Sequence, residues 1–415
     1  MKTLTTVIIG AGQTGLAMSR ELMMHDIDHV VLERGQIANS WRKERWDGLR
    51  LLTPNWLNGL PGQPYRGDDI DGFMPVSELI REFDKMVASA DLPILTDSPV
   101  RSVRMENGQY RVETSQDVIL CKSLVVATGA CARVNRPDFA SELPPNIVEV
   151  SPLTYRRPTD LPDGGVLVVG ASASGVQLAR DIQKSGWQVT LATGSHTRVP
   201  RRYRGVDIMT WMHLLGHLGK AYDEVDNIDR VRRLPSFQLC GEPSTQDLDL
   251  NALQDAGIEI VGRLAGISNG RAMFSGSLNN LCASADLKMD RLLGAIDSWV
   301  DQSGLTQLVE PPHRFSSTRV SSTPRLSLDL EANDIRSIVW ATGYEPDHRF
   351  LQLPIFDAKG RIRHQGGVVA PGLYVMGLMF LRRLSSSFIN GAGDDARDLA
   401  AHLRGCLDGQ IEIAA

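Results

Sequence analysis

The chain has 415 residues, of which 42% are hydrophobic and 22% charged, and this composition excludes a disordered or fibrous protein. A net charge of −5 gives no basic field for nucleic acid, no apolar run is long enough for a transmembrane helix, and the five cysteines form no Cys-x-x-Cys pair. We therefore expect a globular, cytoplasmic protein of two or three domains without a metal site.

The first 33 residues predict a strand, a glycine-rich turn, a helix, a second strand and an acid. The pattern Gly-x-Gly-x-x-Gly occupies residues 10–15, and Glu33 closes the second strand. Such glycines let the backbone approach a pyrophosphate at a helix N-terminus, while the acid accepts hydrogen bonds from a ribose. We expect a dinucleotide to contact Gly10, Gly12, Gln13, Thr14, Gly15, Glu33 and Arg34.

The same arrangement recurs from residue 166 to residue 192. Ser172 stands where the second glycine is expected, and no acid follows the second strand, where Thr193, Gly194 and Ser195 stand instead. Missing acid and nearby basic side chains favour a 2′-phosphate, and hence NADPH over NADH, although a solvated basic loop stays an alternative. The candidate contacts are Gly170, Ser172, Ala173, Ser174, Gly175, His196, Arg198 and Arg201.

Two apolar strands, near 124–126 and 338–340, both end in Ala-Thr-Gly. Each is expected to return beside one of the nucleotide-binding strands, which adds Thr128, Gly129, Thr342 and Gly343 to the candidate contacts. A connector rich in proline and glycine (144–165) marks a boundary. We predict an α/β protein with two Rossmann-like dinucleotide-binding domains, the first formed by 1–160 and 336–415 and the second, at 161–335, inserted into it.

Two other sequence patterns weakly suggest a different function, a metal site and a hydrolase. His213 and His217 have the i, i+4 spacing of metal ligands on a helix, but they lack a neighbouring glutamate and a third ligand. The turn 170–174 ends in serine where a nucleophile elbow requires glycine. We expect a structural role for the histidines and no hydrolase.

Together the motifs resemble the class B flavin-dependent monooxygenases, and the resemblance extends to Trp41-Arg42 and to Ala341-Thr-Gly-Tyr344. It implies FAD at the first glycine motif and NADPH at the second. NADPH would reduce FAD, and O₂ would then form a C4a-(hydro)peroxyflavin that oxygenates a small organic substrate. The resemblance also implies that Asn55 is catalytic, through a hydrogen bond near this adduct, and that FAD contacts Trp41, Arg42, Asn390 and Gly391.

One departure from that family keeps alternatives open. The family has a histidine before the second glycine motif, in the pattern Phe-x-Gly-x-x-x-His, and Ser151 holds its approximate place here. This favours an NADPH-dependent flavoprotein reductase or oxidase without oxygen insertion as the alternative, and a redox-sensing flavoprotein with little turnover as a second one. The substrate and the oligomeric state, a homodimer included, stay open.

Overall fold

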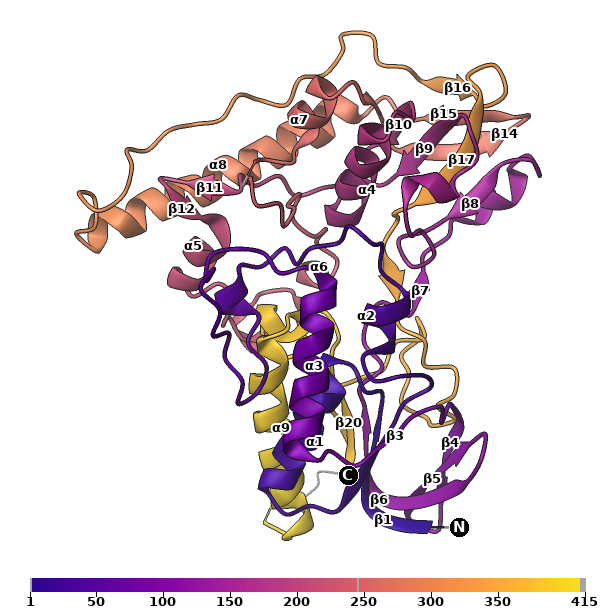
Figure 1. Ribbon diagram of the computed structural model, residues 1–415, viewed down its shortest axis with the longest axis vertical. Helices are drawn as coiled ribbons and strands as arrows, with labels where there is room; N and C mark the ends of the chain where they lie inside the picture. The colour runs from indigo at the N-terminus through magenta and orange to yellow at the C-terminus, as the bar shows by residue number, and fades with distance from the viewer. Residues whose placement is uncertain (1, 245, 411–415) are drawn as a thin grey trace.

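The computed structural model describes residues 2–244 and 246–410, which form two lobes, each with a parallel sheet at its centre (Figure 1). In the first lobe the strands are ordered β19-β20-β6-β1-β2-β3, and β5 and β4 extend the sheet from β6 as an antiparallel hairpin. These strands are β1 (Lys2–Ile9), β2 (His29–Leu32), β3 (Ile94–Leu95), β4 (Val100–Glu106), β5 (Gln109–Thr114), β6 (Val118–Val126), β19 (Val368–Ala370) and β20 (Leu373–Val375).

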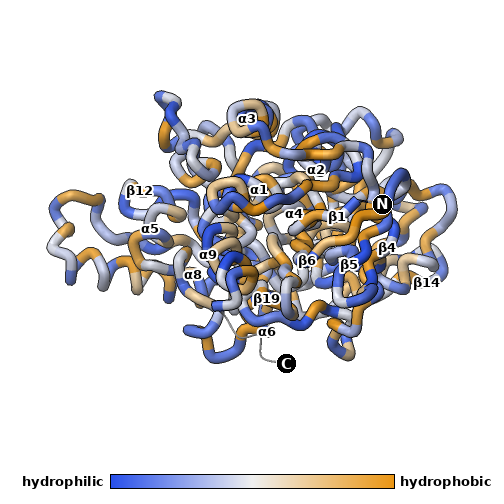
Figure 2. The backbone as a smooth tube through the Cα atoms, turned by 90° about the horizontal axis from the view of Figure 1, so that it is seen from below, coloured by the Kyte–Doolittle hydropathy of each residue, from blue (hydrophilic) through white to orange (hydrophobic). Residues whose placement is uncertain are grey.

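Both faces of this first sheet are covered, which explains why its central strands are continuous apolar runs. Helices α1 (Gln13–Met24), α3 (Val76–Ala90) and α9 (Gly391–Leu407) pack on one face through one hydrophobic cluster, while β4, β5 and residues 351–362 enclose the other. Figure 2 shows the hydrophobic β1 and β6 between the helices α1 and α9 and the hairpin β4–β5.

The second lobe repeats this plan around a sheet with the order β13-β10-β9-β17-β8. Its strands are β8 (Val148–Val150), β9 (Gly165–Val169), β10 (Val189–Ala192), β13 (Glu259–Val261) and β17 (Ile335–Trp340). Helix α4 (Ala173–Lys184), α7 (Leu250–Asp255) and the start of α8 (Leu278–Gln302) pack on one face. A smaller sheet of β14 (Leu264–Ser268), β15 (Arg271–Phe274) and β16 (Ser327–Asp329) covers the other.

The predicted α/β class with two Rossmann-like units is confirmed, and the Ala-Thr-Gly strands return as expected. Strand β6 pairs in parallel with β1, and β17 pairs in parallel with β9. The sheet of the second lobe includes β8 and β17, and of these strands only Ile335 lies within the range 161–335. The connector at 144–165 contains β8 and reaches the first residue of β9, while the position of the domain boundary stays a prediction.

The chain crosses between the lobes at β7 (Arg133–Val134) and β18 (Tyr344–Glu345). These strands pair with each other in antiparallel fashion, with Val134 opposite Tyr344. The hydroxyl of Thr342 donates a hydrogen bond to the carbonyl of Asn135 at 2.5 Å beside them. Entry into and exit from the second lobe therefore form one two-stranded ribbon.

The smaller elements surround the junction of the lobes. They are α2 (Asn39–Lys43), α5 (Ile208–Leu214), α6 (Ile228–Val231), β11 (Arg202–Tyr203) and β12 (Val206–Asp207). Helix α5 ends before His217, so the two histidines do not share a helix face, and within 2–244 and 246–410 no His, Cys, Asp and Glu residues group as metal ligands. None of the helices described is both long and apolar enough to cross a bilayer.

Candidate functional site

The first glycine-rich turn is built so closely that only glycine fits at two positions. Gly10 has φ +104°, and a β-carbon there would lie 2.7 Å from the carbonyl oxygen of Ala127. A β-carbon on Gly15 would overlap the carbonyl oxygen of Gly10, whereas one on Gly12 would meet no atom within 4 Å. The open space is therefore at Gly12, at the N-terminus of α1, where no side chain caps the free N–H groups. This is the cradle that a pyrophosphate requires.

Glu33 lies beside this cradle with its side chain already oriented. Its Oε2 accepts a hydrogen bond from the backbone N–H of Ala11 at 2.8 Å, and Oε1 accepts one from Gly35 at 3.1 Å. The residue is 6% exposed. A carboxylate held by two N–H groups keeps further lone pairs for a ribose hydroxyl.

Two of the candidate residues carry a buried side-chain oxygen without a hydrogen-bond partner, as expected of atoms that meet a ligand. They are the hydroxyl of Thr128 and Oδ1 of Asn390, which precedes the first turn of α9. Gln13 instead accepts a hydrogen bond from the indole of Trp41 at 2.9 Å. Among the remaining candidates Thr14 is buried, Gly129 has a positive φ and Gly391 is the first residue of α9. Arg34 and Arg42 form ion pairs with Glu44 and Asp84.

The second glycine-rich turn repeats the first almost atom for atom. Gly170 has φ +110° and abuts the carbonyl of Ala341, and a β-carbon on Gly175 would overlap the carbonyl oxygen of Gly170. Ser172 takes the place of Gly12 as the N-cap residue of α4 in extended conformation, and its side chain makes no capping hydrogen bond. The N–H groups in the first turn of α4 are thus as available to a phosphate as those of α1. Ala173 begins α4, and Gly343 lies in the segment after β17 whose Ala341 carbonyl abuts Gly170.

The two turns meet at the junction of the lobes. The hydroxyl of Ser174, in the first turn of α4, is 3.3 Å from that of Tyr344 on the connecting ribbon. Burial raises the pKa of Tyr344, and the positive charge of Arg45 opposes this shift. The Arg45 guanidinium in turn lies 4.9 Å from the ring centroid of Trp41, which contacts Gln13 of the first turn. Side chains that contact each turn therefore gather at this junction, Tyr344 beside the second turn and Trp41 with Arg45 beside the first.

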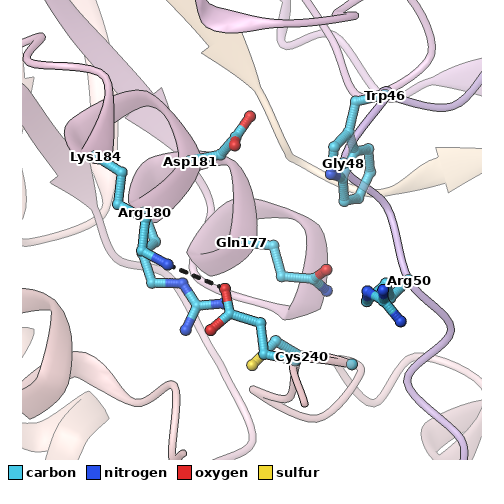
Figure 3. Close-up of a pocket in the computed structure, with 10 residues that line it drawn as sticks. Trp46, Gly48, Arg50, Gln177, Arg180, Asp181, Lys184 and Cys240 are labelled. Carbon is cyan, nitrogen blue, oxygen red and sulfur yellow. Dashed lines mark hydrogen bonds and ion pairs between the residues drawn. The ribbon is translucent and has the colours of Figure 1, made fainter. Parts of the chain in front are cut away.

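A small cavity of about 80 Å³ lies along the same junction (Figure 3). Trp46 and Arg50 of the first lobe face Gln177 and Asp181 of α4 across it. This volume is small for a site that holds an organic substrate. We therefore regard this cavity as part of the interface between the lobes.

The basic residues predicted for the second site do not present free charges. The guanidinium of Arg198 is bound by Asp249 and Asp286, at 2.6 and 2.7 Å. That of Arg201 pairs with Asp207 at 2.6 Å and donates to the carbonyl of Leu52 in the first lobe. Both guanidinium groups are buried in ion pairs within the protein, and their contact with a 2′-phosphate stays a prediction. His196 keeps an unpaired, buried Nε2.

The guanidinium that does lie free at this edge belongs to Arg263, which no local sequence pattern marked. It follows β13 and reaches Ser195, 68 residues away in the chain. Only the pairing of β13 with β10 brings these residues together. The one signal in the sequence was a basic residue shortly after a further strand. Basic residues are common in that position on protein surfaces, so this signal is weak.

Asn55, the candidate catalytic residue, makes its hydrogen bonds within its own loop. Its Nδ2 donates to the carbonyl of Asp69 at 2.8 Å, and its Oδ1 accepts from the N–H of Met74 at 2.8 Å. The residue is 3% exposed. Its amide closes the long loop between α2 and α3, so its hydrogen-bonding groups are committed within the protein. Ser151, similarly, closes a local turn with Thr154.

A family model described as pyridine nucleotide-disulphide oxidoreductase matches residues 7–211. A protein named uncharacterized oxidoreductase CzcO-like, from Geobacillus kaustophilus, is 27% identical over 401 residues, which cover 95% of this chain and 96% of the relative. The probable indole-3-pyruvate monooxygenase YUCCA10 of Arabidopsis thaliana is 30% identical over 200 residues, 45% of this chain and 50% of the relative.

Solved structures share the fold over nearly the whole chain. The flavin-containing monooxygenase from Stenotrophomonas maltophilia superposes with a TM-score of 0.67 and 15% identity, covering 97% of this chain and 98% of that one. The bacillithiol disulfide reductase from Staphylococcus aureus superposes with a TM-score of 0.61 and 14% identity, covering 97% and 98%. At these identities the likeness establishes the architecture of two nucleotide-binding lobes.

Proposed function

Because this chain belongs to the class B flavin-dependent monooxygenase family, we propose that it uses NADPH and O₂ to oxygenate a small organic substrate at bound FAD. The chain is an FAD-dependent oxidoreductase, and the oxygenation is the step proposed here. The observation that carries it is the pair of uncapped glycine turns, one in each lobe, with Ser174 of the second turn beside Tyr344 and Gln13 of the first turn beside Trp41.

The residues of the first turn fit FAD. Gly12 opens the cradle for the pyrophosphate, Glu33 would accept hydrogen bonds from the ribose, and the orphaned polar atoms of Thr128 and Asn390 would pair with the cofactor. The flavin supplies hydride acceptance and reaction with O₂, and the protein supplies binding, orientation and exclusion of water. Helix α9, 17 residues long, begins next to Asn390, so its positive dipole end favours an electron-rich flavin ring.

The residues of the second turn fit a nicotinamide dinucleotide. The N–H groups at the start of α4 are uncapped. Ser172 is larger only than glycine and alanine, so its side chain still lets a phosphate approach the backbone. Ser174 would hold its hydroxyl between a phosphate and Tyr344, which ties nucleotide binding to the ribbon between the lobes. Arg45, stacked on Trp41, keeps a positive charge at this junction.

A specific observation favours the alternative, an NADPH-dependent flavoprotein reductase or oxidase. Ser151 stands in place of the family histidine, and it forms a local turn through a hydrogen bond with Thr154. This position therefore offers no imidazole. A reductase that uses a cysteine pair is disfavoured, because the five cysteines are all free and Cys121, Cys240 and Cys282 are buried. Electron transfer to O₂ or to another acceptor is then the competing outcome.

The stoichiometry of NADPH oxidation decides between these functions. Purified protein is mixed with NADPH and O₂ and with tertiary amines, thioethers or ketones, and NADPH, hydrogen peroxide and oxygenated product are measured together. We expect FAD to co-purify and at least one class of substrate to yield product in place of peroxide. If all NADPH consumed appears as peroxide with every class, the chain is an oxidase; if no FAD binds, the proposal fails.

A further inference from the structure

The edge of the second sheet that carries the glycine turn also carries one unpaired guanidinium. Strands β9, β10 and β13 run parallel, with Val169 opposite Ala192 and Ala192 opposite Val261. Their carboxyl ends therefore share one edge, and the residues that follow them meet there. Arg263 stands two residues beyond the end of β13, and its side chain is exposed.

Arg263 reaches across to the segment that follows β10. Its Nη2 is 3.4 Å from the hydroxyl of Ser195, and its guanidinium lies against Gly194, where an added β-carbon would be 3.6 Å from Nε. The backbone is held by a hydrogen bond from the N–H of Ser275 to the carbonyl of Arg263 at 2.9 Å. Throughout the described part of the chain no carboxylate forms an ion pair with Arg263, in contrast to Arg198 and Arg201.

The residue that faces the nucleotide ribose has also changed between the two lobes. The N–H of Gly10 donates to the carbonyl of Leu32 and that of Gly170 donates to Ala192, at 2.8 and 2.9 Å, so Thr193 holds the position of Glu33. The Thr193 hydroxyl is buried and has no partner. A carboxylate there would repel a phosphate, whereas a neutral hydroxyl does not.

We propose that Arg263, together with Ser195, binds the 2′-phosphate of NADP(H) and makes the second site prefer NADPH to NADH. The planar guanidinium can donate two parallel hydrogen bonds to a phosphomonoester dianion, and Ser195 can donate a third. Gly194 leaves room for the guanidinium to lie close to the backbone. This inference rests on nicotinamide nucleotide binding at the second turn, as in the proposed function.

Direct binding measurements on the flavin-loaded protein test it. Dissociation constants for NADP⁺ and NAD⁺ are measured by calorimetry for the parent protein, for Arg263→Gln and for Arg271→Gln. Arg271, on β15 at the far end of the hairpin that Arg263 begins, is the control for loss of one exposed positive charge. We expect Arg263→Gln to weaken NADP⁺ binding roughly 10- to 100-fold and to leave NAD⁺ binding unchanged. Arg271→Gln should change neither.

A second variant acts in the opposite sense. Thr193→Glu places in the second lobe the acid that Glu33 provides in the first, and it should reverse the preference toward NAD⁺. The NADP⁺ advantage of the parent should also shrink as salt rises, because the phosphate contact is exposed.

The outcomes separate this inference from the proposed function. Equal weakening of NADP⁺ and NAD⁺ by Arg263→Gln, or no weakening of either, overturns the role of Arg263 while nucleotide binding itself stands. If the parent protein binds neither nucleotide, the proposed function fails first. Retained flavin content and thermal stability in each variant show that the differences do not come from unfolding.

Discussion

The carbonyl oxygen of Gly10 lies directly against the α-carbon of Gly15, in the space that a β-carbon would need, and Gly170 and Gly175 have the same relationship. Both helices therefore pack on their strands at a separation that only glycine allows. Gly12 differs, because its missing side chain faces open space. Close packing and ligand approach are thus assigned to different glycines of one motif.

Alanine substitutions at these glycines should separate stability from FAD binding. Gly15→Ala forces α1 away from the turn and should lower the free energy of unfolding by about 1–3 kcal/mol as well as FAD content. Gly12→Ala keeps an allowed extended backbone, so it should lose FAD affinity with unchanged stability of the apoprotein. Flavin absorbance of the purified variants and urea denaturation of the apoproteins measure the two effects. Equal destabilisation by both would contradict the assignment.

Asn55→Ala should affect stability rather than catalysis. Without the amide, the N–H of Met74 and the carbonyl of Asp69 lose their partner, and an unsatisfied buried group costs about 1–3 kcal/mol. The turnover number per bound flavin and the share of NADPH converted to peroxide should stay as in the parent. A large rise in peroxide with unchanged melting temperature would instead restore the catalytic role.

Arg201→Gln should likewise destabilise the protein without changing nucleotide preference. The substitution leaves Asp207 unpaired and breaks the contact with Leu52 across the lobes, and removing one partner of a buried ion pair costs about 3–5 kcal/mol. The ratio of NADP⁺ to NAD⁺ affinity should be retained. Thermal denaturation and calorimetry check both statements, and a selective loss of NADP⁺ binding would favour the original expectation for this residue.

Acid should destabilise the chain through His348. Burial lowers the pKa of His348 to about 4, against the opposing charge of Asp347, and its Nε2 has no partner. An unfolded histidine titrates near 6.5, so the unfolded chain binds more protons between pH 6.5 and 4, and stability falls as pH drops through this window, by at most about 3 kcal/mol. His348→Asn should flatten the profile of unfolding free energy against pH. An unchanged slope would show that His348 titrates normally.

Sequence reasoning succeeded where function is encoded by neighbours in the chain. The turns at 10–15 and 170–175 were predictable because strand, glycines and helix follow within a few residues. Arg263 was not, because its proximity to Ser195 depends on strand pairing. The loop contacts of Asn55 were not predictable, because spacing alone does not tell whether an amide faces a ligand or closes a loop. The ion pairs of Arg198 and Arg201 were not predictable either, since spacing does not show which carboxylates pack against them.

The pairing of β7 with β18 makes the second lobe a cassette whose two ends are adjacent. Val134 and Tyr344 face each other, so a short peptide could join the first lobe where the second now leaves it. Such a chain would keep every strand of the eight-stranded sheet and all of its glycine turn. Gene-level excision of the inserted lobe is thus a route to a flavin-only domain, and exchange of that lobe is a route to a different electron donor.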